Sequence, residues 1–246
     1  MPKPIIRTKA TFQGVTQAGS NITVNTDMNL LKKPVVITVD TAFLSAAGDY
    51  KEEENGTYIV GGAINISETM IRLGLIFSRI ASITIIVPEG IALVGGYPER
   101  RIANAIQTGS GLDGIPITII NSGILFGAGG TREGLINGQA AIYNSRSAND
   151  PIVVINKPTG WISGGGGAGE GAATKGNIYA GGGAPYGRGF GGGGDASLFY
   201  GGPENHRDGD NGGNVGRKGD GSRAGTAGAV YTGAVYMENS GRLGPV

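Results

Sequence analysis

Glycine is concentrated in blocks in the second half of this 246-residue chain, and these blocks limit what the chain can fold into. Of the 49 glycines, 13 lie in residues 1–120 and 36 lie in residues 121–246. Glycine loses more conformational freedom on folding than any other residue, so a chain this rich in glycine is ordinarily disordered. The change in composition predicts two domains, 1–120 and 121–246. The glycine runs lie at 164–167, 181–183, 191–194, 201–202 and 212–213.

These glycine runs also have an ordered alternative. Residues 121–246 hold 10 of the 16 aromatic side chains, whereas disordered chains are poor in aromatic residues. An extended helix with three residues per turn points its N–H and C=O groups outward, and helices without Cβ atoms can approach closely enough to hydrogen-bond sideways. Because buried amides must be paired, we expect a bundle of glycine rods joined by short inserts. Loops displayed on a rigid scaffold are typical of binding proteins.

The first half of the chain predicts a more conventional core. A helix is predicted over 67–80, with Ser67 as its cap and Gly74 in its middle, and residues 82–96 return to strand-like runs. We therefore expect a small α+β or mainly β domain at 1–120, and a mainly β and irregular chain as a whole. Short β-branched runs bounded by Gly, Asn and Asp predict further strands within 10–15, 21–26, 34–43 and 56–66.

A weak internal repeat crosses the expected boundary. "PITIINSGILFGAGG" begins at Pro116 and "PIVVINKPTGWISGGGG" begins at Pro151. Each copy has a proline, four β-favouring residues, an asparagine, a turn, an aromatic residue and then glycines. Two copies are too few to establish a solenoid. They indicate that a strand leads twice into a glycine segment packed beside it. Trp161, in the second copy, is expected to be packed rather than displayed.

The glycine-rich blocks together resemble a known family. "WISGGGGAG", "YAGGGAPYG", "GFGGGGDASLFYGG" and "NGGNVGRKGDG" resemble the receptor-binding adhesins at the tip of the long tail fibres of T-even-like bacteriophages, in particular their Salmonella-phage type. The resemblance covers the whole chain. Any single glycine run would be a weak signal, but the alternation of glycine motifs with short inserts is specific.

The resemblance implies an architecture and a set of partners. One adhesin copy caps the distal end of a trimeric fibre protein through its N-terminal part, so the chain is expected in the virion at the fibre tip. The C-terminal part is implied to be a sandwich of polyglycine-II helices. Loops between its glycine motifs are implied to recognise an outer-membrane protein of the bacterial host, porin-like, with lipopolysaccharide as an additional candidate.

The inserts between glycine runs supply the candidate receptor-binding residues. Tyr, Trp and Arg dominate interface hot spots, and mixtures of Tyr, Gly, Ser and Asn are how antibody loops bind. The competing interpretation is that the aromatic residues fill gaps between rods. The candidates are Tyr179, Tyr186, Arg188, Phe190, Asp195, Leu198, Phe199, Tyr200, Asn205, His206 and Arg207.

Other classes of site find little support in the sequence, and we expect neither cofactor nor metal. The G-x-G-x-x-G match at 109–114 precedes a β-like segment instead of the helix that a dinucleotide site requires. "DGDNGG" at 208–213 places Gly212 where a calcium loop needs its third ligand. The net charge of +1 predicts no nucleic-acid partner, and the chain has no cysteine. We expect neither a signal peptide at the N-terminus nor a membrane-inserted segment.

Three functions follow from these expectations, in order of preference. The first is a tail-fibre adhesin without enzymatic activity. The second is a fibre-assembly chaperone that does not remain in the virion. The third is a glycan hydrolase, which needs two carboxylates about 5–9.5 Å apart. Glu170, Asp195, Glu204 and Asp208 are available for that role, without a pair that stands out.

Overall fold

The computed structural model describes two compact units, residues 1–32 and 33–246. In the first unit, β1 (Thr16–Ala18) and β2 (Asn21–Thr23) pair as an antiparallel hairpin. The described residues are 16–18, 21–23, 32–46, 53–55, 58–96, 103–130, 137–169, 182–185, 212–221 and 224–244.

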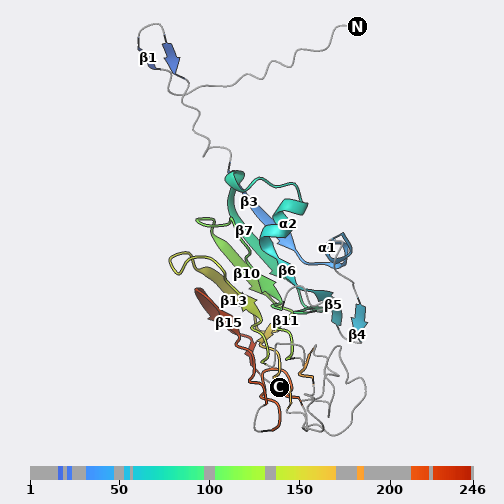
Figure 1. The fold of residues 1–246 in the computed structure, drawn as a ribbon. Helices are drawn as coiled ribbons and strands as arrows, with labels where there is room; N and C mark the ends of the chain where they lie inside the picture. Colours follow the sequence, from blue (N-terminus) through green and yellow to red (C-terminus); the bar gives the residue numbers. More distant parts are fainter. Residues whose placement is uncertain are drawn as a thin grey trace. The chain divides into compact units, whose positions relative to one another are not determined.

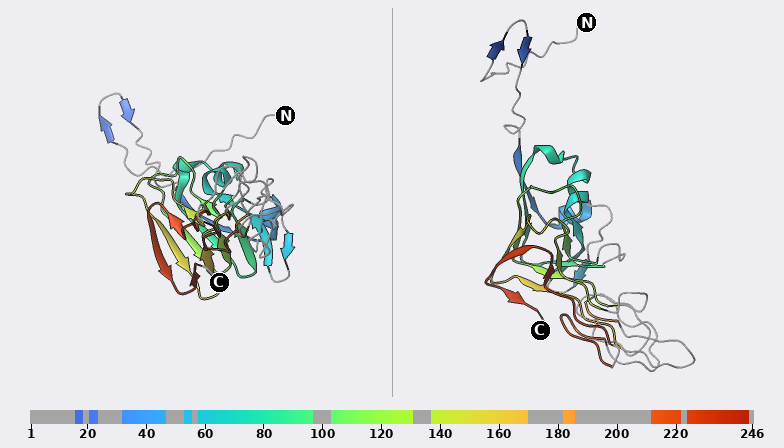
Figure 2. Two further views of the ribbon diagram at one scale, coloured as in Figure 1. Left: turned by 60° about the horizontal axis from the view of Figure 1, so that its bottom comes forward. Right: turned by 60° about the vertical axis from the view of Figure 1, so that its left-hand side comes forward.

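The second unit is built from three almost entirely parallel sheets (Figure 1). Successive passes of the chain add one strand to each sheet, so that neighbouring strands come from neighbouring passes, as in a solenoid. Figure 2 shows the strands stacked in this way, with glycine-rich segments leaving on one side. The mainly β fold class predicted from the sequence is confirmed.

In each sheet, the strands follow one another in the order of the passes. The first contains β3 (Lys33–Thr38), β7 (Ile80–Val87), β10 (Ile117–Asn121), β13 (Ile152–Asn156) and β16 (Val235–Asn239). The second contains β4 (Glu53–Asn55), β5 (Tyr58–Gly62), β8 (Ile91–Val94), β11 (Ile124–Phe126), β14 (Trp161–Ser163) and β17 (Arg242–Leu243), where β4 alone is antiparallel. The third contains β6 (Ile64–Asn65), β9 (Ile106–Gln107), β12 (Ile142–Tyr143) and β15 (Tyr231–Thr232).

The repeat seen in the sequence corresponds to two of these passes. The copy at Pro116 becomes β10 and β11, and the copy at Pro151 becomes β13 and β14. Thr118 pairs with Val153, and Asn121 pairs with Asn156, so equivalent residues of the two copies lie side by side. The repeat extends further than the sequence indicated, because β7–β8 and β16–β17 occupy the equivalent places on either side. Residue 120 lies inside β10, and the functional division at that residue stays a prediction.

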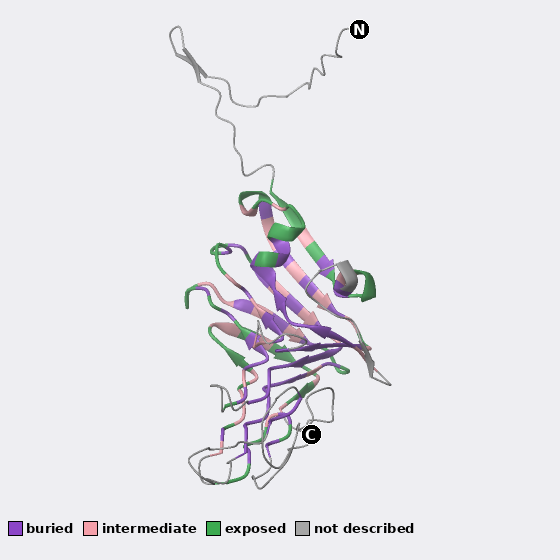
Figure 3. Ribbon diagram, turned by 45° about the vertical axis from the view of Figure 1, so that its right-hand side comes forward, coloured by how far each residue is buried: buried purple, intermediate pink, exposed green. Residues whose placement is uncertain are grey.

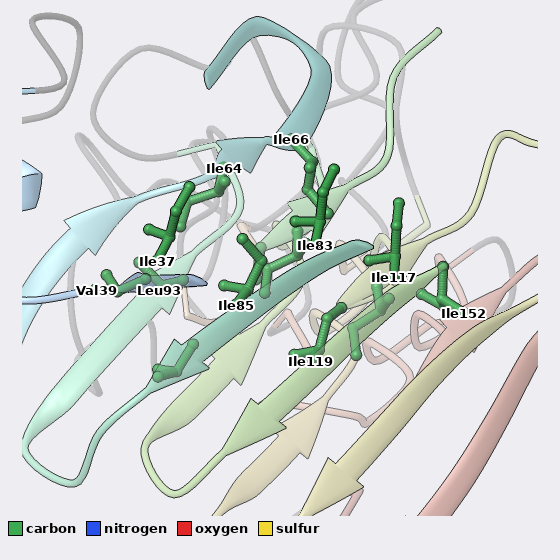
Figure 4. Close-up of a cluster of buried hydrophobic side chains, with 14 of the residues drawn as sticks. Ile37, Val39, Ile64, Ile66, Ile83, Ile85, Leu93, Ile117, Ile119 and Ile152 are labelled. Carbon is green, nitrogen blue, oxygen red and sulfur yellow. The ribbon is translucent and has the colours of Figure 1, made fainter. Parts of the chain in front are cut away.

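Isoleucine and valine fill the space between the sheets. Alternate residues of β7, β10 and β13 are buried, as period-2 strands with one face in a core require (Figure 4). Ile83 pairs with Ile117 and Ile85 with Ile119, so isoleucines stack along the solenoid. Each buried side chain of this size contributes about 1.5–3 kcal/mol. This stack supplies the core that the first half was expected to have.

Only short helices accompany the sheets in the described residues: α1 (Thr41–Ala46), α2 (Ile66–Arg72) and the 3₁₀ turn η2 (Phe77–Arg79). The helix predicted over 67–80 therefore ends early. Gly74, with φ +70°, takes the left-handed conformation that terminates helices. The cap was also misassigned: Asn65 accepts the N–H of Glu68 at 3.3 Å and donates to its carboxylate at 2.9 Å, forming a reciprocal cap. Ser67 instead donates to the Ser110 carbonyl at 2.7 Å.

A ladder of asparagines runs through the first sheet at the ends of its strands. Asn121 donates through Nδ2 to Oδ1 of Asn156 at 2.9 Å, and Asn156 donates in the same way to Asn239 at 2.7 Å. Asn121 and Asn156 are fully buried. The ladder ends at β7, where Val87 is the register partner of Asn121 and the Oδ1 atom of Asn121 has no hydrogen-bond partner. The side-chain amides thus fix the register of three successive passes.

We predict that Asn156→Ala lowers the free energy of unfolding by about 2 kcal/mol, because the buried amide of Asn121 loses the acceptor of its N–H group. Asn239→Ala is the matched control, since Asn239 is exposed and water can replace the lost bond; its cost is expected to stay below about 1 kcal/mol. Urea unfolding followed by circular dichroism measures both. Equal losses for the two variants would argue against a ladder that fixes register.

Candidate functional site

The glycine segments leave the solenoid at a single corner. The chain departs after β8, β11 and β14 and returns to begin β9, β12 and β15. The described parts of these excursions include Gly127–Gly130, Gly138–Ala141, Gly164–Gly169, Gly182–Pro185, Gly212–Gly221 and Ala224–Ala229, and none of them is helix or strand. Each successive pass therefore adds glycine-rich backbone beside that of the previous one.

Backbone hydrogen bonds connect these segments sideways. Ala128 donates to the carbonyl of Ala103 at 2.8 Å, Gln139 to that of Ala128 at 2.8 Å, and Gly165 to that of Gln139 at 2.9 Å. Gly228 then donates to Gly165 at 2.8 Å. The two glycine segments of the sequence repeat also meet, because Gly130 donates to Gly166 at 2.7 Å. The glycine segments of neighbouring passes therefore pair directly through their backbones.

The segment 164–168 bonds more neighbours than a strand in a sheet can. Its N–H groups at Gly165, Gly166 and Gly167 donate in turn to Gln139, Ala184 and Arg217, which belong to three different segments. Its carbonyls repeat every three residues: Gly165 and Ala168 accept from Gly228 and Gly225. Gly164 and Gly167 likewise accept from Gly216 and Gly213. A strand alternates between two neighbours, whereas this segment surrounds itself with several at a three-residue period.

Side chains have no room at these positions. A Cβ atom added to Gly166 would collide with the carbonyl oxygen of Gly213 and lie 2.6 Å from that of Asn214. A Cβ on Gly165 would collide with the carbonyl of Ala128, and one on Gly167 with that of Gly225. The neighbours are backbone atoms, which cannot move aside as a flexible side chain would. The glycine runs are therefore required by the spacing of the segments.

The candidate receptor-binding residues lie outside the described part of the chain. This holds for Tyr179 and for the group from Tyr186 to Arg207. The residues that flank the second group are described, and they touch each other: Ala184 donates its N–H to the carbonyl of Gly213 at 3.0 Å. The described residues on either side of segment 186–211 therefore lie next to each other in the glycine assembly. Its role in binding stays a prediction.

Trp161 packs as expected from the sequence. Its indole N–H donates to the Gly244 carbonyl at 2.8 Å, and its ring meets that of Phe126 edge-on at 4.6 Å between centroids. The guanidinium of Arg242 lies 4.1 Å from the centre of the indole ring. These contacts hold the last pass of the chain, β17, against β14. The strand before β17, β16, packs onto the same body through its pairing with β13.

A buried ion pair stabilises a different corner, where the third sheet passes to the first. Arg146 donates to the carbonyls of Leu112 at 3.1 Å and Ile115 at 2.7 Å, and pairs with Asp150 at 3.1 Å. Burial lowers the pKa of Arg146, while the charges of Asp150 and Asp113 oppose that shift. Arg146 therefore joins successive corner loops. No sequence pattern predicts this role, because the partners of Arg146 are mostly backbone carbonyls.

The structure can be searched for metal sites and membrane-spanning helices only in the residues that it describes. There, no group of three or more His, Asp or Glu side chains is placed to hold a metal ion. Among the described helices, none has both the length and the apolar character to cross a bilayer. The carboxylates considered for hydrolysis, Glu170, Asp195, Glu204 and Asp208, lie outside these residues.

Comparison with known proteins identifies the class of this fold. Residues 55–245 match the model of a family described as the phage tail fibre adhesin Gp38. This match covers most of the chain, which therefore belongs to the Gp38 family of phage tail fibre adhesins. Membership of an adhesin family indicates a binding role at the tail fibre. No curated protein matches the chain.

A solved structure has a similar fold. It is the gp37–gp38 adhesin tip complex of the long tail fibre of bacteriophage S16, with a TM-score of 0.52 and 22% identity. The match covers 86% of this chain and 81% of the other. The resemblance seen in the sequence is thus confirmed at the level of the family and the fold.

We predict that Gly166→Ala destabilises the protein by about 3 kcal/mol or more, because the added methyl group overlaps backbone atoms. Gly74→Ala is the control: its Cβ meets no atom within 4 Å, and only the positive φ is unfavourable. That variant should lose about 1–2 kcal/mol. Thermal unfolding compares them, and an equal or smaller loss for Gly166→Ala would refute the close-packing argument.

Proposed function

We propose that this chain is the receptor-binding adhesin at the distal tip of a phage long tail fibre. One copy caps a trimeric fibre protein, to which residues 1–120 contribute the attachment. Inserts between the glycine segments of residues 121–246 recognise a porin-like outer-membrane protein of the host, with lipopolysaccharide as an additional candidate ligand. The S16 adhesin was solved in a complex with gp37, which supports a fibre protein as one partner.

Polyglycine-II helices are the structure that best accounts for the glycine assembly. Such helices have three residues per turn, so successive N–H groups point to neighbours about 120° apart. The bonds of Gly165, Gly166 and Gly167 to three different segments fit this geometry. So does the three-residue spacing of the carbonyls that accept from 213–216 and from 225–228. A lattice of this kind is rigid where its segments pair, and a rigid scaffold lowers the entropic cost of binding.

The observation that carries the proposal is the bond between Ala184 and Gly213. It joins two buried residues that flank segment 186–211, with a hydrogen bond of 3.0 Å. Ten of the eleven candidate residues, all except Tyr179, fall within that segment. Aromatic and arginine side chains between closely joined ends are the composition and connection expected of a displayed binding loop.

Adsorption to host cells tests this function. The purified chain, bound to a fibre-tip fragment and labelled with a fluorophore, is mixed with hosts that each lack one outer-membrane protein. Loss of binding with one deletion supports receptor recognition. Binding to none of the parental strains, together with an increased yield of folded fibre trimer, would support the assembly chaperone instead. Release of soluble sugar from envelopes would favour the hydrolase.

We predict that Phe199→Ala and Tyr200→Ala each weaken adsorption at least tenfold, because aromatic hot spots contribute about 2 kcal/mol or more. Their thermal unfolding should match that of the wild type. Tyr236→Ala is the control, since this tyrosine is 68% exposed on β16 and lies outside the inserts. Flow cytometry on receptor-positive cells measures adsorption, and undiminished binding by both variants would remove these residues from the proposed site.

A further inference from the structure

An exposed apolar patch spans the last turn of α2 and the loop that follows it. Ile71, Leu73 and Ile76 are 62%, 53% and 55% exposed, although they lie within six residues of one another in the chain. We call these three residues the α2 patch. The other large exposed apolar side chains of the described residues come from five separate strands. Clustered exposed apolar residues mark interaction sites more often than scattered ones do.

Backbone hydrogen bonds hold the α2 patch in place. Leu73 donates to the Thr69 carbonyl at 3.0 Å, Gly74 to that of Ile71 at 2.9 Å, and Arg79 to that of Ile76 at 2.9 Å. Leu75, between Leu73 and Ile76, and Phe77, directly after Ile76, pack against the core. The exposed side chains therefore sit on an ordered backbone, so a partner would not have to order this loop on binding.

Basic residues dominate the charge around the patch. The segment 66–79 carries Arg72 and Arg79 and a single acid, Glu68, which already bonds Asn65 at 2.9 Å. Lys33, exposed at the start of β3, is the register partner of Ile80 and so lies beside the end of this segment. A complementary partner presents apolar side chains surrounded by carboxylates.

The patch lies far from the glycine assembly. Figure 1 and Figure 3 show α2 at one end of the second unit and the glycine segments 164–169, 212–221 and 224–229 at the other. If the inserts face the host cell, the α2 patch faces the opposite way, where a fibre has to join.

We propose that the α2 patch is the centre of the surface that docks onto the distal tip of the fibre protein. This inference rests on the function proposed above. Three side chains are too few for a complete interface, which buries about 800 Å² on each partner, but hot spots occupy only its centre. The basic rim adds a contribution that weakens with salt.

The test uses the full chain and the C-terminal trimeric fragment of its cognate fibre protein. Isothermal titration calorimetry compares the wild type with the double variant Ile71→Asp/Ile76→Asp, for which we expect at least 100-fold weaker binding. Tyr236→Asp, which places the same charge at an exposed residue on β16, should bind the fibre as the wild type does. Circular dichroism checks the fold of all three proteins. Raising NaCl from 50 to 500 mM should weaken wild-type binding.

A second measurement does not depend on a destabilising charge. Leu73 is replaced by the photo-crosslinker p-benzoylphenylalanine, Leu73→Bpa, and irradiation of the complex should join the adhesin to the fibre chain. Tyr236→Bpa should give no crosslink.

The outcomes separate the docking surface from the proposed function. If the wild type binds the fibre but the double variant binds equally well and Leu73→Bpa gives no crosslink, the docking surface is wrong and the function survives. If the wild type does not bind the fibre at all, the proposed attachment fails as well. If the wild-type chain is a dimer that the double variant converts to a monomer, the patch joins two copies of this chain, and fibre docking is overturned.

Discussion

The sideways hydrogen bonds between glycine backbones are the constraint on which the glycine-rich part of the structure depends. A buried amide without a partner costs about 1–3 kcal/mol, so segments outside helices and sheets can be buried only if neighbours satisfy them. Gly166 illustrates the solution, since it donates to Ala184 and accepts from Gly130. The segments around Gly166 come so close that a Cβ on it would strike the carbonyl oxygen of Gly213. The glycine content is therefore a consequence of backbone pairing at short range.

The solenoid provides the alignment that makes this pairing possible. Parallel strands lie about 4.8 Å apart, and each pass begins its glycine excursion where the previous one did. Phe126 and Ser163 are register partners at the ends of β11 and β14, and the next bond, from Gly127 to the Ser163 carbonyl at 3.0 Å, continues outward from that pairing. The ordering cost of glycine is offset because the first bond of each excursion is already set by the sheet. The asparagine ladder at 121, 156 and 239 contributes by fixing the register of the same passes.

The sequence predicts the class of fold, the repeat and the family, but it does not predict the solenoid. The obstacle was physical: β14 ends at Ser163 and β15 begins at Tyr231, so most of the glycine-rich sequence lies within a single pass. In β7, Val87 takes the ladder position that Asn121 holds in β10, so the copies differ at their most distinctive residue. The predicted helix ends before Gly74 because this residue has a positive φ, which an α-helix cannot continue through. The candidate binding residues between 186 and 207 were chosen by composition, which indicates display without indicating which side chains make contact.

A continuous path of backbone pairing connects the two ends of the second unit. Ser67, at the start of α2, donates to Thr108 at 3.0 Å, Thr108 to Tyr143 at 3.1 Å, and Asn144 to Thr232 at 3.0 Å. These bonds link α2 to the passes from which the glycine segments leave. Motions that would change the angle between the two ends would have to break buried ladder bonds, in contrast to proteins whose domains meet through a linker. If the chain caps a fibre as proposed, this rigidity means that the direction of the fibre fixes the direction in which the glycine segments leave the solenoid. Successful contact then depends on how the fibre approaches the cell, and several fibres engaging together add avidity without requiring each tip to bind tightly.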